Sequence, residues 1–146
     1  MTTYSFLDIS ATITGPGGSF SLGSGSGNAE EGITIEASED IDSMTIGADG
    51  SVMHSLHANK SGTVTIHYLK ISPQNAKLSA MYALQTAAGA LHGNNTIVVS
   101  NLYTNDVIAM TQVAFRRAPN INYAKEGGLV DWQFNAGVIE RTLGTP

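Results

Sequence analysis

The chain of 146 residues is long enough to bury a sizeable core, and its lack of cysteine excludes disulfides, zinc thiolates and thiol nucleophiles. Its charge is divided: the first 59 residues hold eight of the twelve acidic residues and no lysine or arginine, and all seven basic residues lie from Lys60 onward. This division indicates surfaces that meet another molecule, for example a second copy, and it argues against a basic face for nucleic acid. No apolar run approaches the roughly 20 residues of a membrane span. We expect a soluble protein, made inside the cell without a secretory signal, that contacts no membrane.

Short segments of alternating apolar and polar residues predict a β-rich fold. The alternation is clearest where Val64, Ile66 and Tyr68 alternate with two threonines and a histidine. Turns rich in glycine or proline separate the segments, so the first two form a predicted hairpin. Strands are expected at residues 7–14, 20–22, 33–36, 44–46, 63–68, 97–99, 107–115 and 130–138.

One helix is predicted in the middle of the chain. Ser72 is a favourable N-cap, and Pro73 suits the first helical position, where a missing N–H is harmless. Apolar residues then recur at helical spacing, and Gly89 and Gly93 mark the expected end. The stripe consists of Met81, Leu84, Ala88 and Leu91.

Trp132 and Phe134 alternate with polar residues, so they are expected to be buried between the sheet and the helix, near Met81 and Leu84. The elements together predict one domain over residues 1–146. Its fold class is mainly β, a β-sandwich or barrel with one packed α-helix.

Residues 38–61 are the least core-like segment, because they are polar and carry only scattered apolar side chains around an Asp-Gly turn. One interpretation is an ordinary surface loop. The other is a protruding hairpin that docks on a neighbouring subunit, so that its apolar residues look exposed in a monomer. The residues assigned to this inter-subunit or inter-ring contact are Met44, Ile46, Asp49, Val52, Met53 and Leu56.

No group of residues in the sequence has the spacing of a catalytic or metal site. His54 and His57 are three apart in a loop-like segment without a third ligand. Asp40 and Asp42 begin like a calcium loop, but the glycine and glutamate that should follow are missing. Arg116-Arg117 is interpreted as a surface or subunit contact. We therefore predict a protein that is not an enzyme and needs no cofactor.

Several segments, in order along nearly the whole chain, resemble the tail tube proteins of contractile-tailed bacteriophages. The similar stretches include Tyr4-Ser-Phe-Leu-Asp8, Gly15-Pro-Gly-Gly-Ser19-Phe20, Ala29-Glu-Glu-Gly-Ile33, Thr45-Ile-Gly-Ala-Asp-Gly-Ser51, His54-Ser-Leu-His57, Lys60-Ser-Gly-Thr-Val64, Ser72-Pro-Gln-Asn75, Gln112-Val-Ala-Phe115 and Tyr123-Ala-Lys-Glu-Gly127. Residues 138–146 match the family pattern least.

The resemblance implies a β-barrel or sandwich subunit whose homohexameric rings stack into a tube inside a contractile sheath. The implied partners are further copies, the sheath protein and, transiently in the lumen, the tape measure protein and DNA. The implied location is the virion tail, after assembly in the host cytoplasm. A type VI secretion-like tube subunit is the near alternative. A small β-sandwich carbohydrate-binding module and an enzyme of unfamiliar design are alternatives from other classes.

A lumen that lets DNA slide should not bind phosphate, so we expect its lining to be neutral or negative. Strands that line a tube send alternate residues to the core and to the channel. The candidate channel residues are the polar partners of apolar alternations, namely Thr34, Glu36, Thr63, Thr65, Asp131 and Gln133.

Overall fold

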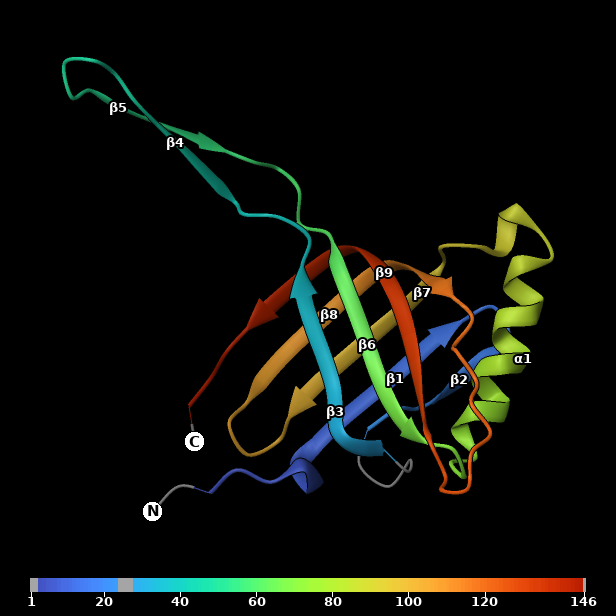
Figure 1. Ribbon diagram of the computed structural model, residues 1–146. Helices are drawn as coiled ribbons and strands as arrows, with labels where there is room; N and C mark the ends of the chain where they lie inside the picture. Colours follow the sequence, from blue (N-terminus) through green and yellow to red (C-terminus); the bar gives the residue numbers. More distant parts are fainter. Residues whose placement is uncertain (1–2, 24–27, 146) are drawn as a thin grey trace.

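The computed structural model describes residues 3–23 and 28–145. Seven strands form one antiparallel sheet, and two further strands form a separate hairpin (Figure 1). No helix among the described residues is long and apolar enough to cross a membrane. The sheet contains β1 (Ile9–Gly15), β2 (Gly18–Ser21), β3 (Asn28–Ala37), β6 (Gly62–Leu69), β7 (Asn95–Asn101), β8 (Asp106–Arg117) and β9 (Leu129–Thr142). The other elements are the hairpin strands β4 (Asp42–Ile46) and β5 (Val52–Leu56), the helix α1 (Gln74–Thr86), and the 3-10 turns η1 (Phe6–Asp8) and η2 (Gly89–Leu91).

The sheet folds over itself into two layers. Its strand order is β2-β1-β7-β8-β9-β6-β3, and Figure 1 shows β3, β6 and β9 crossing in front of β8, β7 and β1. The hydroxyl of Tyr68, on β6, donates a buried hydrogen bond of 3.0 Å to the carbonyl of Leu22, just after β2. These two residues lie near opposite edges of the strand order, so the edges approach one another. The fold is mainly β, a sandwich with one packed helix, as the sequence predicts.

The two longest strands change their inward face at one point. Met110 and then Val113 are buried on β8, and Ala136 and then Ile139 on β9, an interval of three instead of two. Gln112 has a positive φ of 54°, and two residues of β8 oppose one of β7 there, which is a β-bulge. A Cβ atom on Gly137 would lie 2.8 Å from the Cβ of Gln112, so only glycine fits opposite the bulge.

The helix α1 closes one side of the core. Its buried side chains are Gln74, Leu78, Met81 and Gln85. Gln85 and Asn95 exchange two buried hydrogen bonds of 2.7 Å, and Gln85 Nε2 also donates to the carbonyl of Pro16 at 2.8 Å. This amide pair joins the helix to β7 and to the β1–β2 turn.

An aromatic cluster continues the packing from the helix into the sheet. Tyr82 meets Phe115 edge-on at 5.4 Å between ring centroids, and Phe115 contacts both Trp132 and Phe134. Trp132 also donates from Nε1 to Oδ1 of Asn75 at 3.1 Å. The predicted burial of Trp132 and Phe134 is confirmed, with both side chains at most 3% exposed.

Three local predictions are wrong. Leu84 is 44% exposed, because the buried stripe of α1 runs through Gln85 instead. The helix begins at Gln74, with the Ser72 hydroxyl accepting from the Gln74 N–H at 3.3 Å, and it ends at Thr86, before Ala88. The first strand begins at Ile9, because the Ser5 side chain accepts from the Leu7 N–H and caps a 3-10 turn.

Replacing Trp132 by alanine should lower the free energy of unfolding by about 3–5 kcal/mol, the usual range for a buried large aromatic residue. The change removes ring contacts with Phe115 and the hydrogen bond to Asn75. Urea unfolding measures the loss, and Trp132→Phe should cost less. A wild-type emission maximum typical of fully hydrated tryptophan would contradict this burial.

Stability should fall above about pH 10, the ordinary pKa of tyrosine. Burial raises the pKa of Tyr68, so the folded protein holds this proton more tightly than the unfolded chain does. The stability linked to this proton is complete below about pH 10 and is lost as the pH rises above it. The free energy of unfolding, measured from neutral to alkaline pH, should fall less steeply with pH for Tyr68→Phe than for the wild-type protein. Equal slopes for the two proteins would refute the linkage.

Candidate functional site

The hairpin of β4 and β5 projects away from the folded sheet (Figure 1). Within the described residues these strands pair only with each other. The hairpin leaves the body between the end of β3 and the start of β6. There the Ser38 N–H donates to the Ser61 carbonyl at 3.0 Å, and the two hydroxyls lie 2.8 Å apart. The base of the hairpin is therefore fixed to the sheet while its strands extend into solvent.

The tip of the hairpin is a defined turn. Gly47 N–H donates to Ser51 at 2.7 Å, and Gly50 adopts a φ of 88° that suits glycine. Asp49 Oδ1 accepts from the Ser51 N–H at 3.0 Å. The backbone N–H and then the hydroxyl of Ser51 lower the pKa of Asp49, so this carboxylate stays ionised and stabilises the turn.

The hairpin has one apolar face. Directly paired residues share a face, and the pairs Asp42–Leu56, Met44–His54 and Ile46–Val52 alternate with Ser43–Ser55 and Thr45–Met53. Met44, Ile46, Val52 and Leu56 form the apolar hairpin face, and Asp42 and His54 lie on the same side of the hairpin, 3.0 Å apart.

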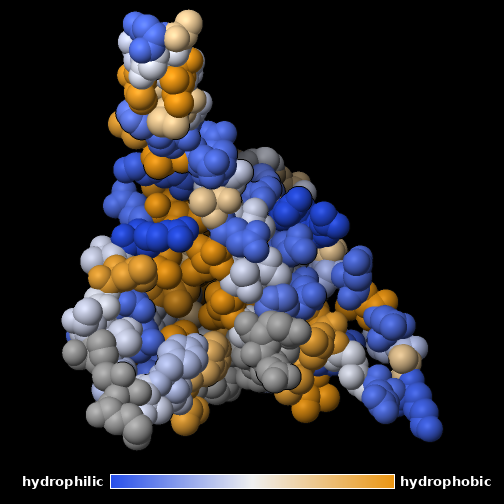
Figure 2. Space-filling view, turned by 60° about the vertical axis from the view of Figure 1, so that its left-hand side comes forward, coloured by the Kyte–Doolittle hydropathy of each residue, from blue (hydrophilic) through white to orange (hydrophobic). Residues whose placement is uncertain are grey.

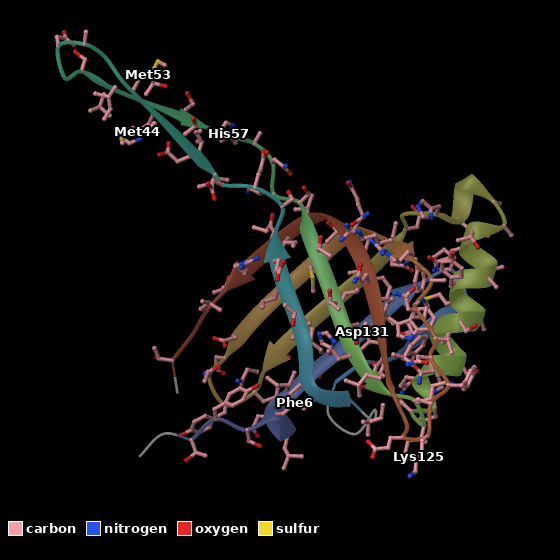
Figure 3. All side chains as sticks on the ribbon, in the orientation of Figure 1. Phe6, Met44, Met53, His57, Lys125 and Asp131 are labelled. Carbon is pink, nitrogen blue, oxygen red and sulfur yellow. The ribbon has the colours of Figure 1, made fainter. Side chains whose placement is uncertain are left out.

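Met53 lies on the opposite side of the hairpin from the apolar hairpin face. Figure 3 shows Met44 and Met53 pointing away from each other. Of the six residues assigned to this segment from sequence, four thus share a face, Met53 lies behind them, and Asp49 sits in the turn.

The apolar hairpin face has no packing partner among the described residues. Met44 is 56% exposed and Leu56 is 83% exposed. Figure 2 shows hydrophobic residues interspersed with hydrophilic ones along the protrusion. An isolated two-stranded hairpin is at best marginally stable in water. Apolar surface displayed in this way marks an interaction site.

A second candidate surface lies on the outer face of β3, β6 and β9. The register pairs Glu36 with Thr63 and Thr34 with Thr65 on one side of β6. On the other side Thr65 pairs with Gln133 and His67 with Asp131. All six residues predicted from sequence to line a channel therefore share one face, which is called the polar sheet face below.

The polar sheet face carries few charges. Asp131 Oδ1 lies 2.7 Å from His67 Nδ1, an ion pair when the histidine is protonated. Glu36 is the other acid among the side chains that the structure describes on this face, and Arg117 pairs with Gln133 where β8 meets β9. Threonine and amide groups make up most of the remaining surface, which therefore offers no dense basic patch to a phosphate backbone.

The outer face of the other layer combines serines and threonines with the exposed valines Val98 and Val107, and the sequence analysis did not single it out. Ser10 pairs with Ser100, and Thr14 pairs with both Thr96 and Ser19. Thr14 Oγ1 lies 3.1 Å from Ser19 Oγ. Ser10, Thr12 and Thr14 alternate with the apolar residues Ala11 and Ile13, and this alternation was the signal that could have identified the face.

The described residues hold no cluster of three or more His, Asp or Glu side chains placed to bind a metal ion. His54 Nδ1 instead faces Asp42 Oδ2 at 3.0 Å on the hairpin, exposed to solvent.

Several solved structures similar to this chain come from contractile injection systems. The chain superposes on a sheath/tube terminator of the extracellular contractile injection system PVC with a TM-score of 0.62 and 7% identity, covering 97% of this chain and 98% of that one. It superposes on the tube-terminating cap of the anti-feeding prophage with a TM-score of 0.57 and 13% identity, covering 99% and 95%. A chain of the PVC sheath-tube complex gives a TM-score of 0.54 at 8% identity, covering 91% and 88%. These likenesses establish the fold class.

The family follows from the sequence itself. The family model of the bacteriophage PhiTE tail tube protein matches residues 1–144. The chain belongs to this tail tube family. No curated protein matches it in sequence.

Proposed function

We propose that this chain is the structural subunit of a phage tail tube, in which hexameric rings stack into a hollow tube that conducts DNA during ejection. Membership of the tail tube family supports a structural role without catalysis. The observation that carries the proposal is the apolar hairpin face, which projects from the body and has no partner within the described residues. A neighbouring copy covers it in the stacked tube.

A ring joins two different surfaces of each subunit, head to tail. The strand order leaves β2 and β3 as the two edges of the sheet, and edge strands offer unpaired backbone groups to a neighbour. The acidic first 59 residues and the more basic remainder supply complementary charge. These features favour a closed heterologous contact between adjacent copies.

The polar sheet face is the proposed lining of the lumen. Its two acids, Glu36 and Asp131, outnumber its one arginine, Arg117, so the wall is neutral to acidic and lets DNA phosphate slide without sticking. The Ser/Thr face of the other layer then points outward, toward the contractile sheath. In the simpler alternative these acids only keep the subunit soluble.

The proposed partners are further copies of the chain, the sheath protein, and the tape measure protein and DNA as transient occupants of the lumen. The proposed location is the virion tail, assembled in the host cytoplasm. A type VI secretion-like tube subunit would form similar rings. A carbohydrate-binding module would stay monomeric, and burial of the single tryptophan leaves it unable to stack on a sugar. Negative-stain images of the purified protein separate assembly from a stable monomer.

Met44→Asp should block tube formation, because docking would bury an unpaired charge. The concentration needed for assembly should rise by roughly 10–100-fold, which corresponds to about 1.4–2.8 kcal/mol. Met53→Asp is the matched control, since Met53 is equally exposed but lies on the opposite face of the same hairpin. Sedimentation and negative-stain imaging measure assembly, and circular dichroism checks the fold. Equal loss in both variants would contradict docking through the apolar hairpin face.

Assembly should shield a thiol at position 65, on the polar sheet face, from a large reagent more than a thiol at position 12, on the outer face of the other layer. The chain has no native cysteine, so Thr65→Cys and Thr12→Cys each carry one unique thiol. A polymer-linked maleimide should label Thr65→Cys far more slowly in tubes than in monomers, because it must enter through the tube ends. Thr12→Cys should label at similar rates in both states. The reverse pattern would place the other layer in the lumen.

A further inference from the structure

A pocket of about 590 Å³ lies at the N-terminal end of α1. Trp132 and Tyr82 form part of its wall, and Pro119 and Ile121 come from the segment between β8 and β9. The pocket is large enough to take several apolar side chains. It is called the helix-end pocket below.

Lys70 is the basic residue that lines the helix-end pocket, and its Nζ lies 5.6 Å from the centre of the Tyr123 ring. In the sequence, Arg116 precedes the lining residue Ala118, and Lys125 and Glu126 follow in the same connection. The register places Arg117 beside Gln133, on the polar sheet face. The pocket wall therefore carries one positive side chain, Lys70.

The segment that carries the apolar hairpin face has the opposite charge. Residues 38–59 contain Glu39, Asp40, Asp42 and Asp49 and no lysine or arginine. An acidic hairpin with an apolar face is complementary to a largely apolar pocket whose wall carries Lys70.

The hairpin and the pocket lie at opposite ends of β6. The hairpin joins the body at Gly62, where β6 begins, and the pocket includes Lys70, directly after β6 ends. A strand of eight residues spans roughly 25 Å. Figure 3 shows Lys125 at the far end of the molecule from Met44 and Met53. A hairpin therefore reaches the pocket of the next copy when subunits stack along this direction.

A second exposed apolar area, around Leu102, is a less favourable docking site for the hairpin than the helix-end pocket. Leu102 is 71% exposed and its N–H donates to the Asp8 carbonyl at 3.0 Å, beside the turn that leads to Asp106. The carboxylates of Asp8 and Asp106 would repel the acidic hairpin.

We infer that the apolar hairpin face of one subunit docks in the helix-end pocket of a second copy in the adjacent ring, with Lys70 of the pocket facing the hairpin carboxylates. This contact rests on the proposed tube function and names the surface that receives the hairpin. In this contact the side chain of Met44 or Ile46 of one copy enters between Ile121 and Tyr82 of the second copy.

Cross-linking in assembled protein tests the contact. Met44→Cys protein is mixed with Ile121→Cys protein, assembled and treated with a short bismaleimide. The control mixture pairs Met44→Cys with Leu102→Cys, which is more exposed than Ile121 and so favours any non-specific reaction. The first mixture should give about tenfold or more cross-linked dimer than the second, because docking raises the effective concentration of the two thiols.

The outcomes separate this contact from the proposed function. Tubes in negative stain together with dominant 44–121 cross-links support both. Tubes without 44–121 cross-links above the level in unassembled monomer overturn the helix-end pocket and leave the tube function standing. Failure of the wild-type protein to assemble, with no cross-link in either mixture, overturns both.

Discussion

A single antiparallel sheet can enclose a core by folding over itself, and here the sheet folds along β8 and β9. The bulge at Gln112, opposite Gly137, changes which side of both strands faces inward. Once the sheet has folded, Tyr68 reaches the carbonyl of Leu22 and α1 closes the open side. The positions of the two outer faces and of the hairpin follow from this folding.

Folding the sheet in this way buries the side chains of its inner side. The two outer faces and the hairpin remain exposed. The polar sheet face and the Ser/Thr face of the other layer remain exposed on opposite layers. The hairpin adds apolar surface that the subunit itself does not cover. The proposed assembly would cover this surface, which suits a member of the tail tube family.

Alternation in the sequence predicted the strands and placed the channel candidates on one face, because a period of two fixes which side chains share a side. It could not predict that Gln85 and Asn95 form a buried pair, since polar residues look like surface positions until their partners are known. Leu84 was misplaced for the same reason: the helix faces the core through Gln85. The hairpin's faces and the helix-end pocket needed the register and tertiary contacts that no local pattern contains.

Hydrogen exchange in monomer and in assembled tube tests most directly the claim that the hairpin is completed by a second copy. Amides of β4 and β5 should exchange quickly in the monomer and become strongly protected on assembly, whereas amides of β6 and β9 should be protected in both states. Hairpin amides that are already protected in the monomer, or that stay unprotected in assembled tubes, would contradict the account.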